Sequence, residues 1–175
     1  MPLVLPKNSD GILLREFRFD DAEPLAEIEY DLNVKRYIAV PSRERTEWLR
    51  DFSPGLIRGC AIEAIPEQVL AGRASISRTG TQGEGELEIV IARRFWGQRL
   101  GRKTVALLIP AAFEEMSATS VIAVIHPDNQ ASLKLIQSSG FTYRDKKRGD
   151  PKHWQYGHLI YELTRTVYSS SLQII

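Results

Sequence analysis

The sequence predicts a single α/β domain, residues 1–175, built on a mixed and mostly antiparallel sheet. One reason is a hairpin pattern, in which the apolar residues 60–65 and 69–77 flank a turn at Pro66. The other is an almost uninterrupted apolar run over residues 120–126, directly after a predicted helix. Such a run is typical of a strand that is covered on both faces and paired in parallel. A hydrophobic fraction of 43% and a charged fraction of 26% are typical of one globular domain.

The N-terminal third predicts one strand and two helices. Residues 1–10 have no strong pattern and are expected to form a flexible arm, and residues 11–18 read as a strand. A capping-box-like acidic start and an apolar stripe predict a helix over residues 20–32. Ser42 is the expected cap of a second helix over residues 42–52. These two helices either form the wall of an acceptor pocket or simply cover one face of the sheet.

The middle of the chain predicts a strand over residues 86–93 followed by a helix over residues 102–117. The strand alternates with a period of two, so its side chains divide between two faces. One face is expected to carry Leu87, Ile89 and Ile91, and the other Glu86, Glu88 and Val90. Two carboxylates therefore share one face just before the turn that leads into the helix.

The C-terminal part predicts a helix over residues 130–139 and strands over residues 141–144 and 157–164. The basic run at residues 146–148 is expected to be a solvated loop, with a ligand contact as the alternative. Residues 166–175 form a tail without a structural prediction. Together these segments give seven strands and about four helices.

The composition restricts the class of protein. A formal charge of +1 argues against a protein built to coat nucleic acid, and no nucleic-acid partner is expected. Cys60 is the only cysteine, so neither an internal disulfide nor a cysteine metal site can form, which suits a reducing compartment. The first residues have no signal-peptide pattern and no apolar span was found, so we expect a cytoplasmic protein without a membrane partner.

The most informative stretch is the strand-to-helix turn at residues 93–104. Five of its twelve residues are Arg or Lys, and Gly97 and Gly101 keep its backbone accessible. The first amides of the following helix have no intrahelical partner and lie at the positive end of the helix dipole. Amides, dipole and side-chain charge all favour a phosphorylated ligand.

Two common phosphate-binding loops do not fit this turn. A dinucleotide fingerprint needs the spacing G-x-G-x-x-G, which residues 97–104 lack. A Walker loop needs four residues between its glycines, whereas Gly97 and Gly101 are separated by three.

The turn instead resembles a known family. The stretch from Phe95 to Lys103 is similar to the acyl-CoA-binding turn of the GNAT superfamily of N-acyltransferases, most closely in the RimJ/RimL-like branch that acetylates N-terminal amines of ribosomal proteins. Residues 126–132 with Gly140 and Phe141 resemble the second signature of that branch. The opening segment, Leu14-Arg15 with residues 20–22, resembles the start of the branch. The order and spacing match from about residue 11 to residue 164.

This resemblance implies a GNAT fold whose sheet splays centrally, where two strands run parallel. It also implies acetyl-CoA as a substrate, no metal, and transfer of the acetyl group to a primary amine, either a protein N-terminus or a small amine, by direct attack in a ternary complex. A homodimer is left open. The residues implied to bind the cofactor are Ile91 and Ala92 along the pantetheine arm, the amides of Gln98, Arg99, Leu100, Gly101, Arg102 and Lys103 at the pyrophosphate, and Asn129, whose alternative role is a helix cap.

The catalytic residues implied by the resemblance are Glu88 and Ser132. An attacking amine must lose its proton, so Glu88 is expected to be the base, unless it is only a solvent-facing strand residue. Many relatives carry a tyrosine where this chain has Ile136, and Ser132 is therefore the candidate acid, unless it only caps a helix or touches pantetheine. His126 is either a proton relay or a structural residue.

One departure from the family pattern affects the function. Arg99 stands where the pattern has a glycine, and its side chain either folds away and adds a phosphate contact or partly blocks the site. The alternative function is therefore a CoA-binding sensor or interaction module with little or no turnover. Tyr143, Trp154 and Tyr156 either line an acceptor pocket or belong to the core and its rim.

Overall fold

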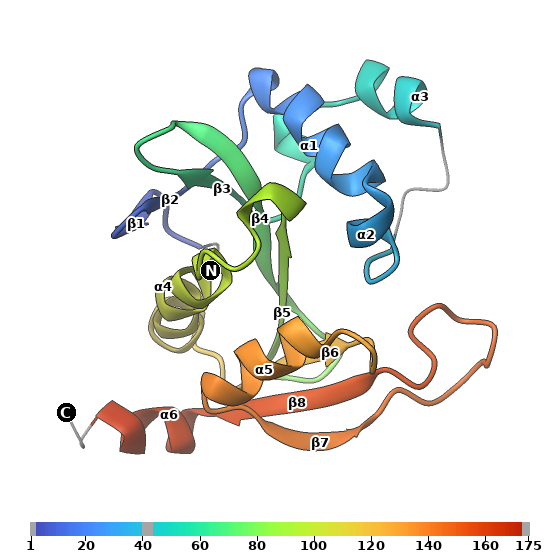
Figure 1. Ribbon diagram of the computed structural model, residues 1–175. Coiled ribbons are helices and arrows are strands. Elements are labelled where there is room, and N and C mark those ends of the chain that lie inside the picture. Colours follow the sequence, from blue (N-terminus) through green and yellow to red (C-terminus); the bar gives the residue numbers. More distant parts are fainter. Residues whose placement is uncertain (1–2, 40–43, 173–175) are drawn as a thin grey trace. The chain divides into compact units, whose positions relative to one another are not determined.

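The computed structural model describes residues 3–39 and 44–172, which fall into two compact units (Figure 1). The N-terminal unit comprises Val4–Ser75 and Ile89–Leu107. The C-terminal unit comprises Met1–Leu3, Ile76–Glu88 and Leu108–Ile175. The extent of the domain as a whole stays a prediction.

Antiparallel strands form the sheet of the N-terminal unit: β1 Lys7–Ser9, β2 Ile12–Arg15, β3 Cys60–Ala64 and β4 Val69–Arg78. The hairpin of β3 and β4 confirms the sequence prediction. The predicted flexible arm is wrong for residues 7–9, because Gly11, with a φ of 77°, turns the chain so that β1 pairs with β2. The observed strand β2 is also shorter than the strand predicted over residues 11–18.

The helical elements of the same unit are η1 Phe19–Asp21, α1 Ala22–Tyr30, α2 Leu32–Lys35, α3 Arg45–Arg50 and η2 Pro54–Leu56. The helix predicted over residues 20–32 is interrupted at Asp31, which is extended and whose side chain accepts hydrogen bonds from the amides of Asn33 and Val34. Asp31 thereby caps a second helix. The predicted cap Ser42 lies outside the described residues. A buried ion pair between Glu29 and Arg73 ties α1 to β4, so α1 covers the sheet.

A buried charge cluster joins β2, η1 and β3. The Arg15 guanidinium donates to both carboxylate oxygens of Asp21, at 2.7 and 2.8 Å, and through Nε to Glu63 at 2.5 Å. Burial alone would raise the pKa of Asp21, but hydrogen bonds from Arg15 and from the Arg18 amide lower it below 3.8. The same bonds raise the pKa of Arg15. The sequence placed the capping carboxylate at residue 20, whereas Asp21 accepts from the Arg18 amide.

The C-terminal unit is built around β5 Glu84–Ile91, β6 Ser120–Ile125, β8 Leu159–Thr164 and β7 Thr142–Lys146. β5 and β6 are parallel, with Glu84 opposite Ser120 and Glu86 opposite Ile122, which confirms the predicted parallel pair. β8 is antiparallel to both β6 and β7. The complete strand order is β1-β2-β3-β4-β5-β6-β8-β7, and the eighth strand relative to the predicted seven is β1.

The remaining α-helices of the described residues are α4 Leu100–Glu114, α5 Gln130–Ser138 and α6 Arg165–Leu172. Figure 1 shows α5 lying along β8, and Gln137 Nε2 donates to the Tyr161 hydroxyl at 3.1 Å. α6 occupies much of the tail that had no prediction, and the Arg165 side chain holds it to the carbonyls of Phe113 and Ala118. With α2 and α6 the described helices number six rather than about four. None of them is both long and apolar enough to cross a membrane.

The two faces of the C-terminal sheet differ in chemistry. Paired residues on neighbouring strands point to the same side, so the register assigns the faces. One face is the buried core of this unit and carries Leu87, Val121, Ala123, Ile125, Tyr161 and Leu163. The opposite face, here called the polar face, carries Glu84, Glu86, Ile122, Val124, Ile160 and Glu162, and continues to His126 and His158.

Candidate functional site

The turn after β5 is an exposed loop that is held by internal hydrogen bonds. The short helix η3 Arg93–Phe95 anchors it through the buried Phe95 ring. The Trp96 indole donates to the Ile91 carbonyl at 2.8 Å, and Gln98 Nε2 donates to the Arg94 carbonyl at 3.1 Å. These bonds hold the loop against the end of the strand while its outer backbone stays open to solvent.

Two residues of this turn have left-handed backbone conformations. Gly97 has a φ of 79° and Arg99 a φ of 62°. Glycine adopts this region readily, whereas a residue with a Cβ does so at a cost of roughly 1–2 kcal/mol. The Arg99 carbonyl accepts from the Lys103 amide at 3.1 Å, so Arg99 stands directly before the first turn of α4. The backbone at the position of the family's glycine therefore has a glycine-like conformation, although the residue is arginine.

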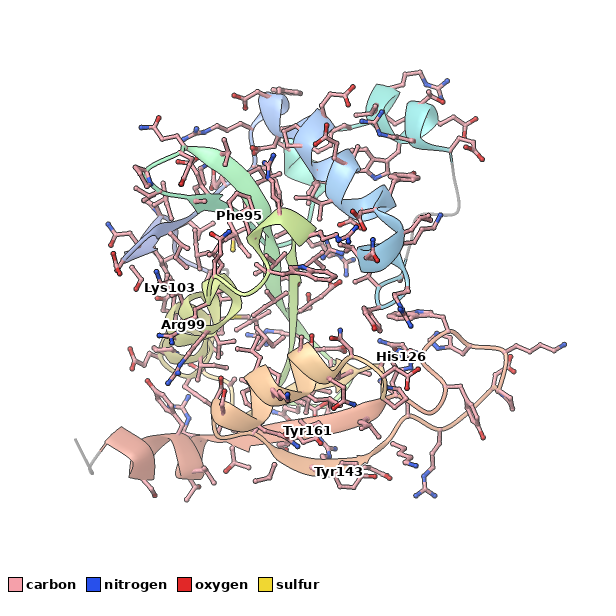
Figure 2. The ribbon with its side chains drawn as sticks, viewed as in Figure 1. Phe95, Arg99, Lys103, His126, Tyr143 and Tyr161 are labelled. Carbon is pink, nitrogen blue, oxygen red and sulfur yellow. The ribbon has the colours of Figure 1, made fainter. Side chains whose placement is uncertain are left out.

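Positive charge surrounds the start of α4. Arg93, Arg94, Arg99 and Arg102 are exposed, and Figure 2 shows Arg99 and Lys103 at this end of the helix. Lys103 is half-buried, with its Nζ 3.7 Å from Asp10 Oδ2. The amides of the first helical turn point toward the same region because an α-helix leaves them without an internal partner. This arrangement favours a phosphate or pyrophosphate.

The end of β5 packs closely against β4. Val90, which the period of two places on the face of Glu86 and Glu88, is buried. A Cβ on Gly72 would lie only 2.1 Å from the Val90 carbonyl oxygen, so this close approach of the two strands requires glycine. The Ala92 amide then donates to the Ala71 carbonyl at 2.8 Å.

The C-terminal unit contains the two carboxylates that were expected beside the turn. Glu88 is exposed, while Glu86 is half-buried on the polar face. Burial raises the pKa of Glu86, the charge of Lys147 lowers it, and Glu88 and Glu84 raise it further. Glu84 is buried and paired with Arg144. The half-buried environment of Glu86 therefore makes its carboxylate hold a proton more strongly than usual.

Asn129 and Ser132 lie together at the start of α5. The Asn129 side-chain oxygen accepts from the Ser132 amide at 3.2 Å, which makes Asn129 the N-cap and confirms its helix-cap role. Ser132 is half-buried in the first turn and is not the cap. Ile136 is buried on the same helix. At the end of β6, His126 Nδ1 accepts from the Asp128 amide at 3.1 Å.

His158 is a candidate residue that the sequence analysis missed. It directly precedes β8, is 4% exposed, and has no hydrogen-bond partner for either ring nitrogen within the described structure. Its ring lies edge-on to His126, at 5.0 Å between centroids, and 5.3 Å from Trp154. Burial lowers its pKa, and the proximity of His126 lowers it further. In the sequence His158 lies within the strand predicted over residues 157–164, and nothing there marks its missing partners or its neighbour across the sheet.

The predicted site residues thus divide between the two units. Those from Ile91 to Lys103 belong to the N-terminal unit, and Glu88, Asn129 and Ser132 belong to the C-terminal unit. Within the C-terminal unit the structure brings Asn129 to Ser132 and places Glu86 within electrostatic reach of Glu88.

Comparison with known proteins identifies the family. The acetyltransferase (GNAT) domain family matches residues 12–142, about three quarters of the chain. This chain belongs to the GNAT acetyltransferase family. A curated relative, the uncharacterized N-acetyltransferase p20 of Bacillus licheniformis, is 22% identical over 142 residues, which cover 76% of this GNAT protein and 80% of the relative.

Solved structures show the same fold. A GNAT-family acetyltransferase from Bacillus anthracis aligns with a TM-score of 0.77 at 20% identity, over 91% of this chain and 98% of that one. RimJ of Mycobacterium smegmatis, solved in complex with CoA-disulfide, aligns with a TM-score of 0.70 at 15% identity, over 89% and 82% of the two chains. A candidate ribosomal-protein-serine acetyltransferase from Vibrio cholerae aligns with a TM-score of 0.75 at 19% identity, over 94% of this chain and 99% of that one.

Proposed function

We propose that this GNAT protein transfers an acetyl group from acetyl-CoA to a primary amine, either a protein N-terminus or a small amine. The observation that carries the proposal is the basic turn before α4, whose backbone is left-handed at Gly97 and Arg99. In a chain of the GNAT family, this turn is suited to a CoA pyrophosphate. The CoA-disulfide bound to the RimJ neighbour supports the same ligand class.

The residues of the turn fit such a ligand. A Cβ at Gly97 would meet no atom within 4 Å, so the backbone there is open for a group to approach closely. The amides from Gln98 to Lys103 would hold the pyrophosphate, and exposed guanidinium groups add charge-assisted hydrogen bonds. Ile91 and Ala92 would lie along the pantetheine arm, and the Asn129 amide nitrogen would donate to it.

The chemistry needs one proton acceptor and one proton donor. When bound, acetyl-CoA supplies an acetyl thioester that a primary amine can attack directly in a ternary complex. We assign Glu88 as the base that removes a proton from the amine, directly or through a water, because it is an exposed residue in the second half of β5. We assign Ser132 as the donor to the departing sulfur, because this half-buried serine lies in the first turn of α5 and its amide donates to the Asn129 side chain.

Two measurements test this function. Titration calorimetry with CoA and acetyl-CoA should show binding, and thiol release in the presence of an amine panel should show transfer. If neither CoA form binds at millimolar concentration, the proposed function is refuted.

A CoA-binding sensor is the second candidate. It is favoured by the arginine at position 99 and by the buried, proton-free side chain of Ile136. Binding of acetyl-CoA without transfer to any amine, and without thioester hydrolysis, would favour the sensor over the enzyme.

A further inference from the structure

The buried His158 ring presents two polar atoms without partners. An unsatisfied buried polar group costs about 1–3 kcal/mol, so such groups normally bind water or a ligand. Replacing the ring by an apolar residue of similar shape would remove this cost. A histidine at position 158 therefore destabilises the fold, and a role in ligand binding would explain its presence.

His158 is the middle of a row that crosses three strands. Ile125 pairs with Leu159, so His126 and His158 are the next opposed residues, and their rings touch edge to face. On the other side the Lys147 amide donates to the His158 carbonyl at 2.8 Å. Lys147, His158 and His126 therefore follow one another across the polar face, and we call them the cationic row.

The row offers mostly hydrogen-bond donors, and its one unpartnered acceptor is the second ring nitrogen of a neutral His158. Because His126 Nδ1 accepts from the Asp128 amide, the neutral ring carries its hydrogen on Nε2. A neutral His158 has one N–H, and the Lys147 ammonium has three. Asp128 is the nearby opposing charge, and its Oδ2 lies 3.9 Å from the Nδ1 edge of His126. Trp154 supplies an aromatic wall beside His158.

A ligand group that only accepts hydrogen bonds matches such a row. Carboxylate and phosphate oxygens are groups of this kind, and they pair best with charged donors. Figure 2 shows His126 at the end of β6, beside the long loop that joins β7 and β8. All three residues of the row belong to the C-terminal unit, so this match does not depend on how the two units are placed.

The same face also carries groups that attract an amine. Glu86 is close enough to Lys147 for the lysine charge to act on its carboxylate, and Glu88 acts on it as well. A polyamine or an aminoglycoside would bring several positive charges beside Lys147, which already carries one. A compact molecule with one amine and one anionic group would match both ends.

We propose that the cationic row binds an anionic oxygen group of the acceptor, so that the preferred acceptor is an amine that also carries a carboxylate or a phosphate. This inference rests on the proposed acetyltransferase function and specifies its substrate class.

The test uses matched pairs of amines. Glycine is compared with glycinamide, an aspartyl peptide amide with its asparaginyl counterpart, and phosphoethanolamine with ethanolamine, each by kcat/KM for thiol release. The anionic member should be preferred at least tenfold, a ratio typical of one charge-assisted hydrogen bond. The first two pairs separate a main-chain carboxylate from a side-chain carboxylate, and the third tests phosphate.

Variants show whether the row causes this preference. Lys147→Gln should lower the ratio about tenfold, and His158→Phe should lower it similarly. Lys152→Gln makes the same charge change in the same loop, outside the row, and should leave the ratio within about twofold. If His158→Phe fails to fold, Lys147→Gln carries the test, because its side chain is only half-buried.

Several outcomes overturn the inference. Equal kcat/KM within every pair, a ratio unchanged by Lys147→Gln, or spermidine as the best acceptor would each do so while leaving acetyl transfer intact. If no amine is acetylated, calorimetry with N-acetylglycine against N-acetylglycinamide replaces kinetics, and equal binding refutes the row. Absence of CoA binding refutes the proposed function separately.

Discussion

Replacement of Arg99 tests the backbone and the ligand contact in one position. The φ of 62° places Arg99 in the left-handed region, one residue before α4. Arg99→Gly removes both the Cβ and the charge, whereas Arg99→Ala removes the charge and keeps the Cβ. The difference between the two variants reports the backbone conformation, and their shared effect reports the side chain.

The expected magnitudes follow from the structure. A left-handed residue with a Cβ costs roughly 1–2 kcal/mol, and the extra freedom of glycine in the unfolded chain costs about 0.4–1 kcal/mol. The glycine variant should therefore be more stable than the alanine variant by up to about 1.6 kcal/mol. At a helical φ the order would reverse, because glycine is about 0.5–1 kcal/mol worse than alanine in a helix. A guanidinium contact to phosphate is worth about 1.5–3 kcal/mol, so both variants should bind CoA at least tenfold more weakly.

Urea unfolding gives the two stabilities, and titration calorimetry gives the CoA dissociation constants. An alanine variant more stable than the glycine variant would refute the left-handed assignment. A CoA affinity that is unchanged in both variants, or tighter in the glycine variant, would show that Arg99 makes no favourable phosphate contact, and a gain would support partial blocking. Lys134→Gln, which removes an exposed charge on α5 outside the turn, is the control and should leave the CoA dissociation constant unchanged.

Three further predictions concern stability, cofactor binding and chemistry. Asp21→Asn should destabilise the fold by about 3–5 kcal/mol in urea unfolding, because it leaves Arg15 buried beside a neutral partner. The pKa of Asp21 is lowered in the folded protein, so this carboxylate stabilises the fold above pH 3.8, and the stabilisation is lost as the pH falls through the lowered pKa. A free energy of unfolding that stays constant below pH 3.8 in the wild type would contradict this. Gly101→Val should abolish CoA binding in calorimetry with little change in circular dichroism, and retained binding would remove Gly101 from the site. Glu88→Gln should slow transfer and spare CoA binding; if it leaves the pH profile of kcat/KM unchanged while Glu86→Gln removes the acidic limb, the base is Glu86 instead.

Local patterns predicted most of the fold. The hairpin of β3 and β4, the parallel strand β6 and the helix α5 follow from periodicity and turn residues alone. The missed strand β1 is only three residues long and depends on a turn at Gly11, so it is too short for a periodic pattern to predict. The break at Asp31 is a competition between helix continuation and side-chain capping, which composition does not decide.

Sequence patterns suffice to propose the part of the site that depends on a backbone motif. They are less informative for residues whose role depends on burial. The turn at residues 93–104 could be proposed as an anion site from the sequence, because glycine leaves the backbone open and arginine supplies positive charge. The unlike environments of Glu86 and Glu88 were not legible, since both alternate onto one face and only tertiary covering distinguishes them. His158 was missed because its significance lies in a missing partner and in a cross-strand neighbour, neither of which a linear sequence displays.

The cationic row and the carboxylates share Lys147, which links specificity to chemistry. Burial raises the pKa of Glu86, and the Lys147 charge opposes this effect. An anionic acceptor group that pairs with Lys147 would neutralise part of the opposing charge, so the pKa of Glu86 would rise further and the carboxylate would hold a proton more strongly. Where Glu86→Gln removes the acidic limb, so that Glu86 rather than Glu88 is the base, this limb of the kcat profile should therefore lie at higher pH with the anionic member of each amine pair than with its neutral partner. Lys147→Gln should remove that difference because no charge is left to neutralise. Identical limbs for both members in the wild-type protein would show that Lys147 does not couple the row to Glu86.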